Sequence, residues 1–309
     1  MSGIALLCSG QGYQGADMFD LLADAPEADA VFKRARLILG GQDPRELVRS
    51  ATHNTLHTNM VGQILCCTQA LAAWAVLRAK VRRPLVVAGY SVGELAAWGV
   101  AGLLGDEAVL YLAVQRAAAM DEATTQPSGL AAIRGLERAT LDPICRTHGA
   151  HVAIVNGEDH MLVGGTMTAL DAVIHDARAA GARSTTILPV AVASHTPLLA
   201  GATDRFRQTL GRAHLAAEVP AGIRLLSGID GAAVFDVRAG ADKLVRQIQQ
   251  TVDWAACMQA CRAAAVTKVV EFGPGDALAR FMREFMPDGD VHGMSEFRSL
   301  AAFEHWVQE

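Results

Sequence analysis

The sequence predicts an α/β fold with a large, mostly parallel sheet and a smaller subdomain inserted into it. Short apolar runs alternate with helix-forming stretches at first, and from about residue 129 this order changes. The early alternation is typical of a parallel sheet that helices cover on both faces. Residues 4–8 predict a strand ending at the Ser-Gly-Gln-Gly turn of 9–12, residues 60–77 a long apolar helix, and residues 85–88 a second strand.

Residues 86–98 carry the most informative motif, an apolar strand that breaks at Gly-Tyr-Ser-Val-Gly and continues as a helix. The pattern is typical of a nucleophile elbow, which exposes a serine on a strained turn of an α/β-hydrolase-like core. The motif alone is common by chance, and its strand and helix context favours catalysis by Ser91. The helix N-terminus offers unpaired N–H groups to an oxyanion, and the Val92 amide is the natural donor.

The later elements occur in the order β-α-β-β-α-β, which predicts a ferredoxin-like subdomain. We place this small subdomain at residues 127–197 and the large catalytic subdomain at 1–126 and 198–309, and we expect the two to pack around a cleft. The predicted strands and helices cover residues 130–135, 137–148, 152–157, 161–165, 169–180 and 184–192.

Composition excludes several classes of function. The formal charge of −5 and pI of 6.1 give no electrostatic reason to expect nucleic acid or an anionic membrane as partner. The six cysteines form no Cys-x-x-Cys or zinc-like pattern, which is typical of a reducing compartment. The first residues form too short an apolar run for a signal peptide, so we expect a cytoplasmic protein.

A catalytic serine needs a base, and His195 is the best candidate among ten histidines. It lies where the last subdomain strand meets a helix that Pro197 would begin. The positive end of a helix dipole disfavours imidazolium and would keep a neutral base available. The alternative is an ordinary polar residue at a helix start.

Arg116 lies in a helix that is otherwise apolar or small around it. Its side chain either extends to solvent or ends in a polar cavity, where the planar guanidinium would bind a carboxylate through two hydrogen bonds. Taken alone, the residue pattern favours the surface position.

Together these motifs resemble the malonyl-CoA:acyl carrier protein transacylases nearly from end to end. They are Gln11 in Ser-Gly-Gln-Gly-Tyr-Gln, Ser91 in Gly-Tyr-Ser-Val-Gly-Glu, Arg116 in Gln-Arg-Ala-Ala-Ala-Met, His195 in Ser-His-Thr-Pro-Leu, and Gly-Pro-Gly at 273–275. Jointly these motifs are far more specific than any one of them.

The resemblance implies a ping-pong transfer of malonyl from malonyl-CoA to the prosthetic-group thiol of an acyl carrier protein, without a metal or redox cofactor. Ser91 would be acylated, His195 would act as base and then as acid, and Arg116 would hold the malonyl carboxylate. The amides of Gln11 and Val92 would form the oxyanion hole.

Three further roles follow from the same resemblance. The family orients its histidine through a backbone carbonyl, here that of Gln247, although the family's usual Pro-Val-x-Trp reads Thr-Val-Asp-Trp at 251–254. Asn156 resembles an asparagine at the subdomain turn, and Gln63 resembles a helix glutamine that faces the site.

Two motifs depart from the fatty-acid synthesis enzymes, which usually read Gly-His-Ser-Leu-Gly and Gly-Gln-Gly-Ser-Gln. This chain has Tyr90, Val92 and Tyr13 at the altered positions. The Gly-Tyr-Ser-Val-Gly-Glu form resembles the epsilon subunit of malonate decarboxylase, whose carrier bears a thiol derived from dephospho-CoA. Tyr90 would then reshape the thiol entrance. The alternative within the family is malonyl transfer for fatty-acid or polyketide synthesis.

Two alternative hypotheses for the function lie outside this family. A serine thioesterase or hydrolase shares the elbow but commonly has a His-Gly-Gly-Gly-like loop, which this sequence lacks. A non-enzymatic carrier-docking subunit would leave the set of Ser91, Arg116 and His195 unexplained. Because such carriers are usually acidic, Arg134 and Arg183 are candidates for contacting one.

Overall fold

The computed structural model describes residues 3–81 and 85–309, and their strands form two five-stranded sheets. The first sheet has the order β10-β9-β1-β2-β7, and every neighbouring pair in it is parallel. The predicted parallel sheet is thus confirmed. Its strands are β1 (Gly3–Cys8), β2 (Leu85–Gly89), β7 (Ile223–Leu225), β9 (Val266–Glu271) and β10 (Asp290–Gly293).

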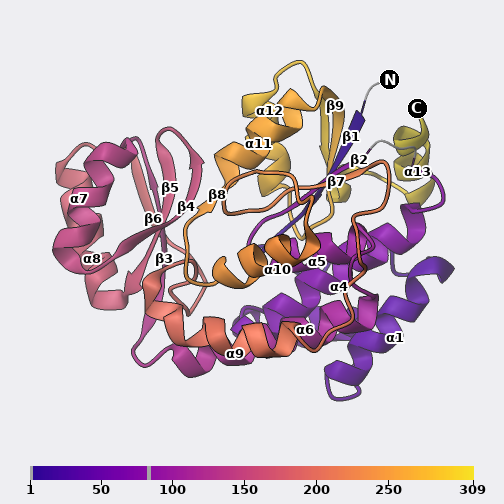
Figure 1. Ribbon diagram of the computed structural model, residues 1–309, viewed down its shortest axis with the longest axis horizontal. Coiled ribbons are helices and arrows are strands. Elements are labelled where there is room, and N and C mark those ends of the chain that lie inside the picture. Colours follow the sequence, from indigo (N-terminus) through magenta and orange to yellow (C-terminus); the bar gives the residue numbers. More distant parts are fainter. Residues whose placement is uncertain (1–2, 82–84) are drawn as a thin grey trace.

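Helices cover both faces of this sheet (Figure 1). Side chains along β1 alternate between two cores: Leu6 belongs to a cluster with α4 (Asn59–Leu77) and α5 (Val92–Val100), and Leu7 to one with α11 (Trp254–Ala263) and α12 (Ala277–Phe285). A strand buried on both sides has no polar face, which explains its continuous apolar run.

Helix α4 is long and apolar enough to cross a membrane by length and composition, with a mean hydropathy of 1.6, but 78% of that stretch is buried inside the protein. It packs against α5 and α6 (Asp106–Ala123) as a core helix. Outside residues 128–187, the described part of the chain also forms α1 (Asp29–Ile38), α2 (Pro44–Ser50), α3 (His53–Leu56), α9 (Ala200–Leu210), α10 (Val237–Arg246), α13 (Leu300–Gln308) and short 3₁₀ turns at Pro26–Ala28, Pro197–Leu199 and Met294–Glu296.

The second sheet has the order β6-β3-β5-β4-β8 and lies at the left of Figure 1 with two helices on its outer side. Residues 128–187 follow the predicted strand and helix order, and the first four strands pair antiparallel. These elements are β3 (Ser128–Arg134), α7 (Arg138–His148), β4 (His151–Gly157), β5 (His160–Thr166), α8 (Met167–Ala179) and β6 (Ser184–Ile187).

One predicted strand was too long: β6 ends at Ile187, whereas the apolar pattern predicted strand to residue 192. Pro189 has no N–H to donate to a ladder and fixes its own φ. The chain turns tightly after it, since the amide of Val190 donates to the carbonyl of Leu188 at 2.8 Å. The segment leading to His195 is therefore a loop.

The two sheets share a hydrophobic core. Leu130 and Ile154 of the second sheet pack in one cluster with Trp254 and with Leu7 of the parallel sheet. Strand β8 (Val252–Asp253) comes from the later part of the chain and pairs parallel with β4. This shared packing fixes the second sheet beside the carboxyl ends of β1 and β2.

Candidate active site

The elbow places Ser91 between the end of β2 and the start of α5. Its φ of 56° and ψ of −121° lie outside the regions that a serine usually adopts. The flanking glycines permit this turn, because a Cβ on Gly89 would come within 2.2 Å of the backbone of Gly93, and one on Gly93 within 2.1 Å of the carbonyl oxygen of Cys8. Only glycine fits where strands and helix approach so closely.

Two loops meet beside the Ser91 hydroxyl, because β1 and β2 are adjacent parallel strands. A Cβ on Gly10 would lie 2.8 Å from the carbonyl oxygen of Tyr90 and 3.5 Å from the Cβ of Ser91, so the loop of Gln11 runs against the elbow. The Val92 amide is the first of α5, and the first amides of a helix have no partner within it. Both predicted oxyanion donors therefore lie next to Ser91, Gln11 in the loop after β1 and Val92 at the start of α5.

His195 lies against the hydroxyl of Ser91. It is 1% exposed, and its Nε2 lies 2.8 Å from the Oγ of Ser91. Its Nδ1 lies 2.6 Å from the carbonyl oxygen of Gln247. Since a carbonyl only accepts, Nδ1 carries the proton and Nε2 presents its lone pair to Ser91. Three described residues other than glycine have positive φ, and His195 (62°) and Ser91 are two of them, as strain at a functional site predicts.

Burial, more than a helix dipole, keeps His195 neutral. Burial and the nearby charge of Arg116 lower the pKa of His195 to about 3. The α-helix expected to begin at Pro197 is not there: residues 197–199 form a 3₁₀ turn, and α9 begins at Ala200. The expected direction is found, with a different main cause.

Arg116 is buried in the protein and not at the surface that its sequence pattern alone favoured, with 1% of its area exposed. Its Nη1 donates to Oε1 of Gln63 at 2.9 Å, and its Nη2 donates to Oε1 of Gln247 at 3.3 Å. Burial lowers the pKa of Arg116 to about 10, so the guanidinium remains charged at neutral pH. Gln63 is itself held by Asn59, whose Oδ1 accepts from its Nε2 at 2.7 Å.

Tyr90 links the elbow to the second sheet. Its hydroxyl donates to Oδ1 of Asn156 at 3.1 Å, and its ring packs edge-on against Trp254 with centroids 5.4 Å apart. Asn156 was expected at a turn, but it lies within β4, because that strand continues to Gly157. Gln63 thus contacts Arg116, and Asn156 contacts Tyr90.

Two buried carboxyl groups near these residues, those of Glu94 and Glu271, were not predicted from the sequence. Glu94 is fully buried in α5, and its Oε2 accepts hydrogen bonds from the side chain of Gln247 and, at 3.1 Å, from the amide of Gly228. Glu271 accepts from the Oγ of Ser9 at 2.6 Å and so ties the loop of Gln11 to β9. Glu94 could have been identified from the sequence, because it is a single acidic residue inside an otherwise apolar helix.

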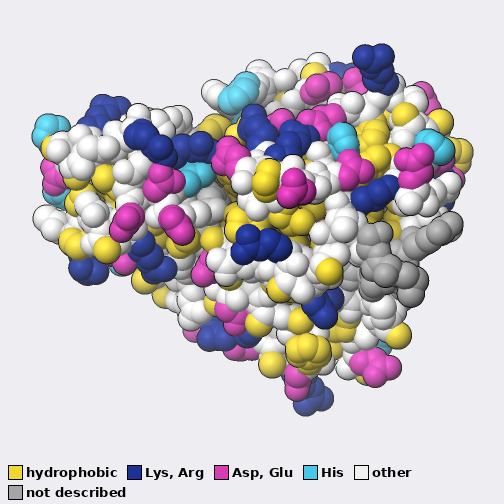
Figure 2. Space-filling view, turned by 90° about the horizontal axis from the view of Figure 1, so that it is seen from above, with side chains coloured by type: hydrophobic (Ala, Val, Ile, Leu, Met, Phe, Trp, Pro, Cys, Tyr) yellow, Lys and Arg dark blue, Asp and Glu magenta, His cyan; other side chains and the backbone are white. Residues whose placement is uncertain are grey.

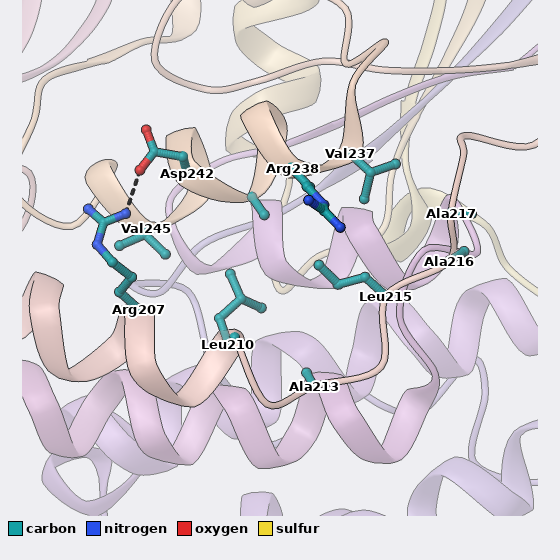
Figure 3. A pocket seen from close by; sticks show the side chains of 12 residues that line it. Arg207, Leu210, Ala213, Leu215, Ala216, Ala217, Val237, Arg238, Asp242 and Val245 are labelled. Carbon is teal, nitrogen blue, oxygen red and sulfur yellow. Dashed lines mark hydrogen bonds and ion pairs between the residues drawn. The ribbon is translucent and has the colours of Figure 1, made fainter.

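A cavity of about 540 Å³ adjoins His195, between α7 and residues 249–251. Another of about 540 Å³ lies between α9 and α10, where an Arg207–Asp242 ion pair borders it (Figure 3), and none of the site residues lines it. Among the described residues no group of three or more His, Cys, Asp or Glu side chains could hold a metal ion.

The two arginines expected to contact a carrier lie at one end of the second sheet, Arg134 at the end of β3 and Arg183 just before β6. Arg134 ends β3 and is exposed, and its carbonyl accepts from the amide of Arg183 at 2.8 Å. The Arg183 guanidinium pairs with Asp159. Beside them, His160 contacts Phe281 of α12 with ring centroids 5.2 Å apart. This end of the second sheet therefore touches a helix that packs on the first sheet.

Comparisons with known proteins agree with this geometry. A family model described as an acyl transferase domain matches residues 5–292. The malonyl CoA-acyl carrier protein transacylase of Mycobacterium bovis is 33% identical over 292 residues, which cover 89% of this chain and 91% of that protein. The protein of that name from Salmonella typhimurium is 27% identical over 309 residues, covering 98% of this chain and 99% of that protein.

The fold is also similar to that of a solved malonyltransferase. The crystal structure of the acyl-carrier-protein S-malonyltransferase from Burkholderia pseudomallei superposes with a TM-score of 0.90 at 28% identity, and all of both chains is covered. The sequence match spans the elbow, the histidine loop and both sheets. The chain therefore belongs to the acyl transferase family that includes the malonyl-CoA:acyl carrier protein transacylases.

Proposed function

We propose that the protein transfers a malonyl group from malonyl-CoA to the prosthetic-group thiol of an acyl carrier protein, through a malonyl ester on Ser91. The observation that carries the proposal is the line of hydrogen bonds from Ser91 through His195 to Gln247, beside a buried Arg116 that Gln247 also contacts. Nucleophile, base and cation for a substrate carboxylate then share one site. The relatives' names support malonyl-CoA as the donor.

The first half-reaction acylates Ser91. Nε2 of His195 takes the hydroxyl proton as Oγ attacks the thioester carbonyl, and the amides of Gln11 and Val92 stabilise the oxyanion. The carbon–sulfur bond then breaks, and the imidazolium returns its proton to the departing CoA thiolate. The carbonyl of Gln247 stabilises the transient imidazolium, in the role that an aspartate has in serine protease triads.

The second half-reaction reverses these steps with the carrier thiol as nucleophile. His195 deprotonates the thiol, the thiolate attacks the malonyl ester, and Ser91 Oγ leaves with the proton held by the imidazolium. Throughout, Arg116 pairs with the free carboxylate of the malonyl group. Its two terminal nitrogens each keep a second N–H beyond those given to Gln63 and Gln247, which fits a bidentate carboxylate.

Two carriers are candidates for the acceptor. The relatives described above are named for an acyl carrier protein and not for a decarboxylase, which favours a carrier of fatty-acid or polyketide synthesis. The Gly-Tyr-Ser-Val-Gly-Glu motif favours the carrier of malonate decarboxylase, and the hydrogen bond of Tyr90 to Asn156 gives that tyrosine a defined position beside Ser91. The proposed function is therefore malonyl transfer to an acyl carrier protein. The carrier of malonate decarboxylase, which the motif favours, is the second candidate for the acceptor.

We further propose that residues 1–126 and 198–309 form the catalytic subdomain and residues 127–197 a ferredoxin-like subdomain, in a cytoplasmic enzyme. An acidic carrier would contact the rim where the second sheet meets α12, near Arg134. Figure 2 shows basic and acidic side chains intermixed on the face that includes this rim, so docking would rely on local pairs and not on a field of one sign.

The test is transfer of radiolabelled malonyl from malonyl-CoA to two purified carriers, one from malonate decarboxylase and one from fatty-acid synthesis. Label on either carrier that disappears with Ser91→Ala supports the function, and the preferred carrier identifies the branch. Label released only as free malonate would indicate a hydrolase and refute the proposal.

A further inference from the structure

The side chain of Gln247 connects Arg116 to a buried carboxyl group, that of Glu94, by one hydrogen bond to each. In the described part of the chain, Glu94 is the only carboxyl group connected to Arg116 in this way. Gln247 Nε2 donates to Oε2 of Glu94, and Gln247 Oε1 accepts from Arg116 at 3.3 Å. The amide therefore turns its oxygen to the cation and its nitrogen to the acid. This orientation is the one that an ionised Glu94 and a charged Arg116 would impose on the dipole between them.

Both charged groups are buried. Glu94 is 0% exposed and Arg116 is 1% exposed, and the contacts of Arg116 with Gln63 and Gln247 are with neutral groups. A buried cation needs a compensating charge, and Glu94 supplies it across one amide. When a substrate carboxylate pairs with Arg116, the same site would hold two anions and one cation.

We propose that Glu94 is the counter-charge of Arg116 in the empty site and binds a proton when the substrate carboxylate pairs with Arg116. Malonyl binding is then linked to proton uptake, whereas binding of an acyl group without a carboxylate is not. This inference rests on the proposed role of Arg116. Oε1 of Glu94 has no hydrogen-bond partner in the described structure and can accept the proton without breaking a contact.

The neighbouring titratable groups leave Glu94 as the one that titrates near neutral pH. Burial raises the pKa of Glu94 to about 7, opposed by the amide of Gly228, by Gln247 and by Arg116. The pKa of His195 lies near 3, burial raises that of Cys67 to about 12, and burial raises that of Cys257 well above its usual range. Asp230, which also faces Glu94, is paired with Lys243 at 2.6 Å.

The linkage has a definite sign. Below about pH 7 Glu94 is already protonated in the empty site, so malonyl binding takes up no proton there. Above this pH a proton must be bound, and malonyl affinity falls relative to acetyl affinity by up to about tenfold per pH unit. The CoA part is common to both ligands and cancels in the comparison.

The test uses the full chain and two readouts. Calorimetric titration of the Ser91→Ala protein with malonyl-CoA and acetyl-CoA, in buffers of different ionisation enthalpy, counts protons taken up. The ratio of kcat/KM for malonyl-CoA to that for acetyl-CoA, measured with Ser91 intact from about pH 6 to 8.5, gives the same linkage kinetically. Glu94→Gln keeps an acceptor oxygen for Gly228 and Gln247 but removes the titration.

With Glu94 present, we expect a malonyl-specific uptake approaching one proton above pH 7, and a kcat/KM ratio that falls with pH; both become flat in Glu94→Gln. A flat ratio with Glu94 present, or a linkage that persists in Glu94→Gln, overturns the inference while leaving the proposed function intact. If Arg116→Met does not weaken malonyl relative to acetyl, the proposed function of Arg116 fails and the inference with it. If Glu94→Gln does not fold, the pH dependence of the malonyl-to-acetyl ratio in the protein that keeps Glu94 still tests the inference.

Discussion

The main-chain carbonyl of Gln247 holds Nδ1 of His195 at 2.6 Å, so a peptide group orients the base where many serine enzymes use a carboxylate. A peptide oxygen does not titrate as pH falls, and it brings no second ionisation into the buried site. Because the side chain of Gln247 contacts Arg116 and Glu94, one residue joins the proposed base to the proposed carboxylate-binding cation.

Arg116→Met removes the cation while keeping an unbranched side chain. We expect kcat/KM for malonyl-CoA to fall by about 10- to 100-fold, from the loss of about 1.5–3 kcal/mol of charge-assisted hydrogen bonding. Acetyl-CoA should lose far less, and Arg116→Lys should restore malonyl only in part, because an ammonium lacks the planar fork. Steady-state kinetics with both donors checks this, and an equal fall for both would show that Arg116 only supports the fold.

The pH dependence of acetyl transfer tests the state of His195. Its pKa in the folded protein, about 3, lies below the ordinary value, so the imidazole stays neutral and available as a base throughout the range above that pH. We expect kcat/KM for acetyl-CoA to stay level from about pH 5 to 8. A tenfold fall for each pH unit below about 6.5 would mean that His195 titrates normally. Thermal unfolding at each pH is the control.

Gly93→Ala tests the close packing of the elbow. The new Cβ would lie 2.1 Å from the carbonyl oxygen of Cys8, in backbone that cannot yield easily. We expect a loss of about 3 kcal/mol in the free energy of unfolding, measured by denaturant titration. Gly105→Ala is the matched control, since nothing lies within 4 Å of its new Cβ. Equal stability of the two variants would contradict the described turn.

Tyr90→Phe separates anchoring from chemistry. The variant keeps the ring contact with Trp254 and loses the hydrogen bond to Asn156, which should lower the free energy of unfolding by about 0.5–1.5 kcal/mol. Acylation by malonyl-CoA should change less than about threefold, because Tyr90 is assigned no proton transfer. A large loss of acylation with unchanged stability would place the Tyr90 hydroxyl in the reaction.

The sequence was sufficient for features that depend on local pattern. The strand, Gly-x-Ser-x-Gly turn and helix around Ser91 follow from apolar runs and glycine spacing, and the order of elements in residues 128–187 follows from alternating periodicity. Resemblance, and not periodicity, pointed to Gln247 and Gln63. Their contacts with His195 and Arg116 join segments far apart in the chain.

The rest depends on tertiary burial, which local pattern does not report. The local pattern around Arg116 favoured a position at the surface, whereas the packing of α6 against α4 and the contact with Gln247 bury it. The neutrality of His195 comes mainly from burial and not from the expected helix. Pairing of β8 with β4 joins residues about a hundred positions apart, and no periodicity within either strand specifies that partner.

The most direct test of the central claim is the mass of the intact protein after mixing with malonyl-CoA, followed by peptide mapping. We predict one malonyl group on Ser91, absent from Ser91→Ala and removed when a carrier bearing a free thiol is added. A malonyl group on another residue, or an ester on Ser91 that water removes as fast as the carrier does, would contradict transfer through Ser91 to a carrier.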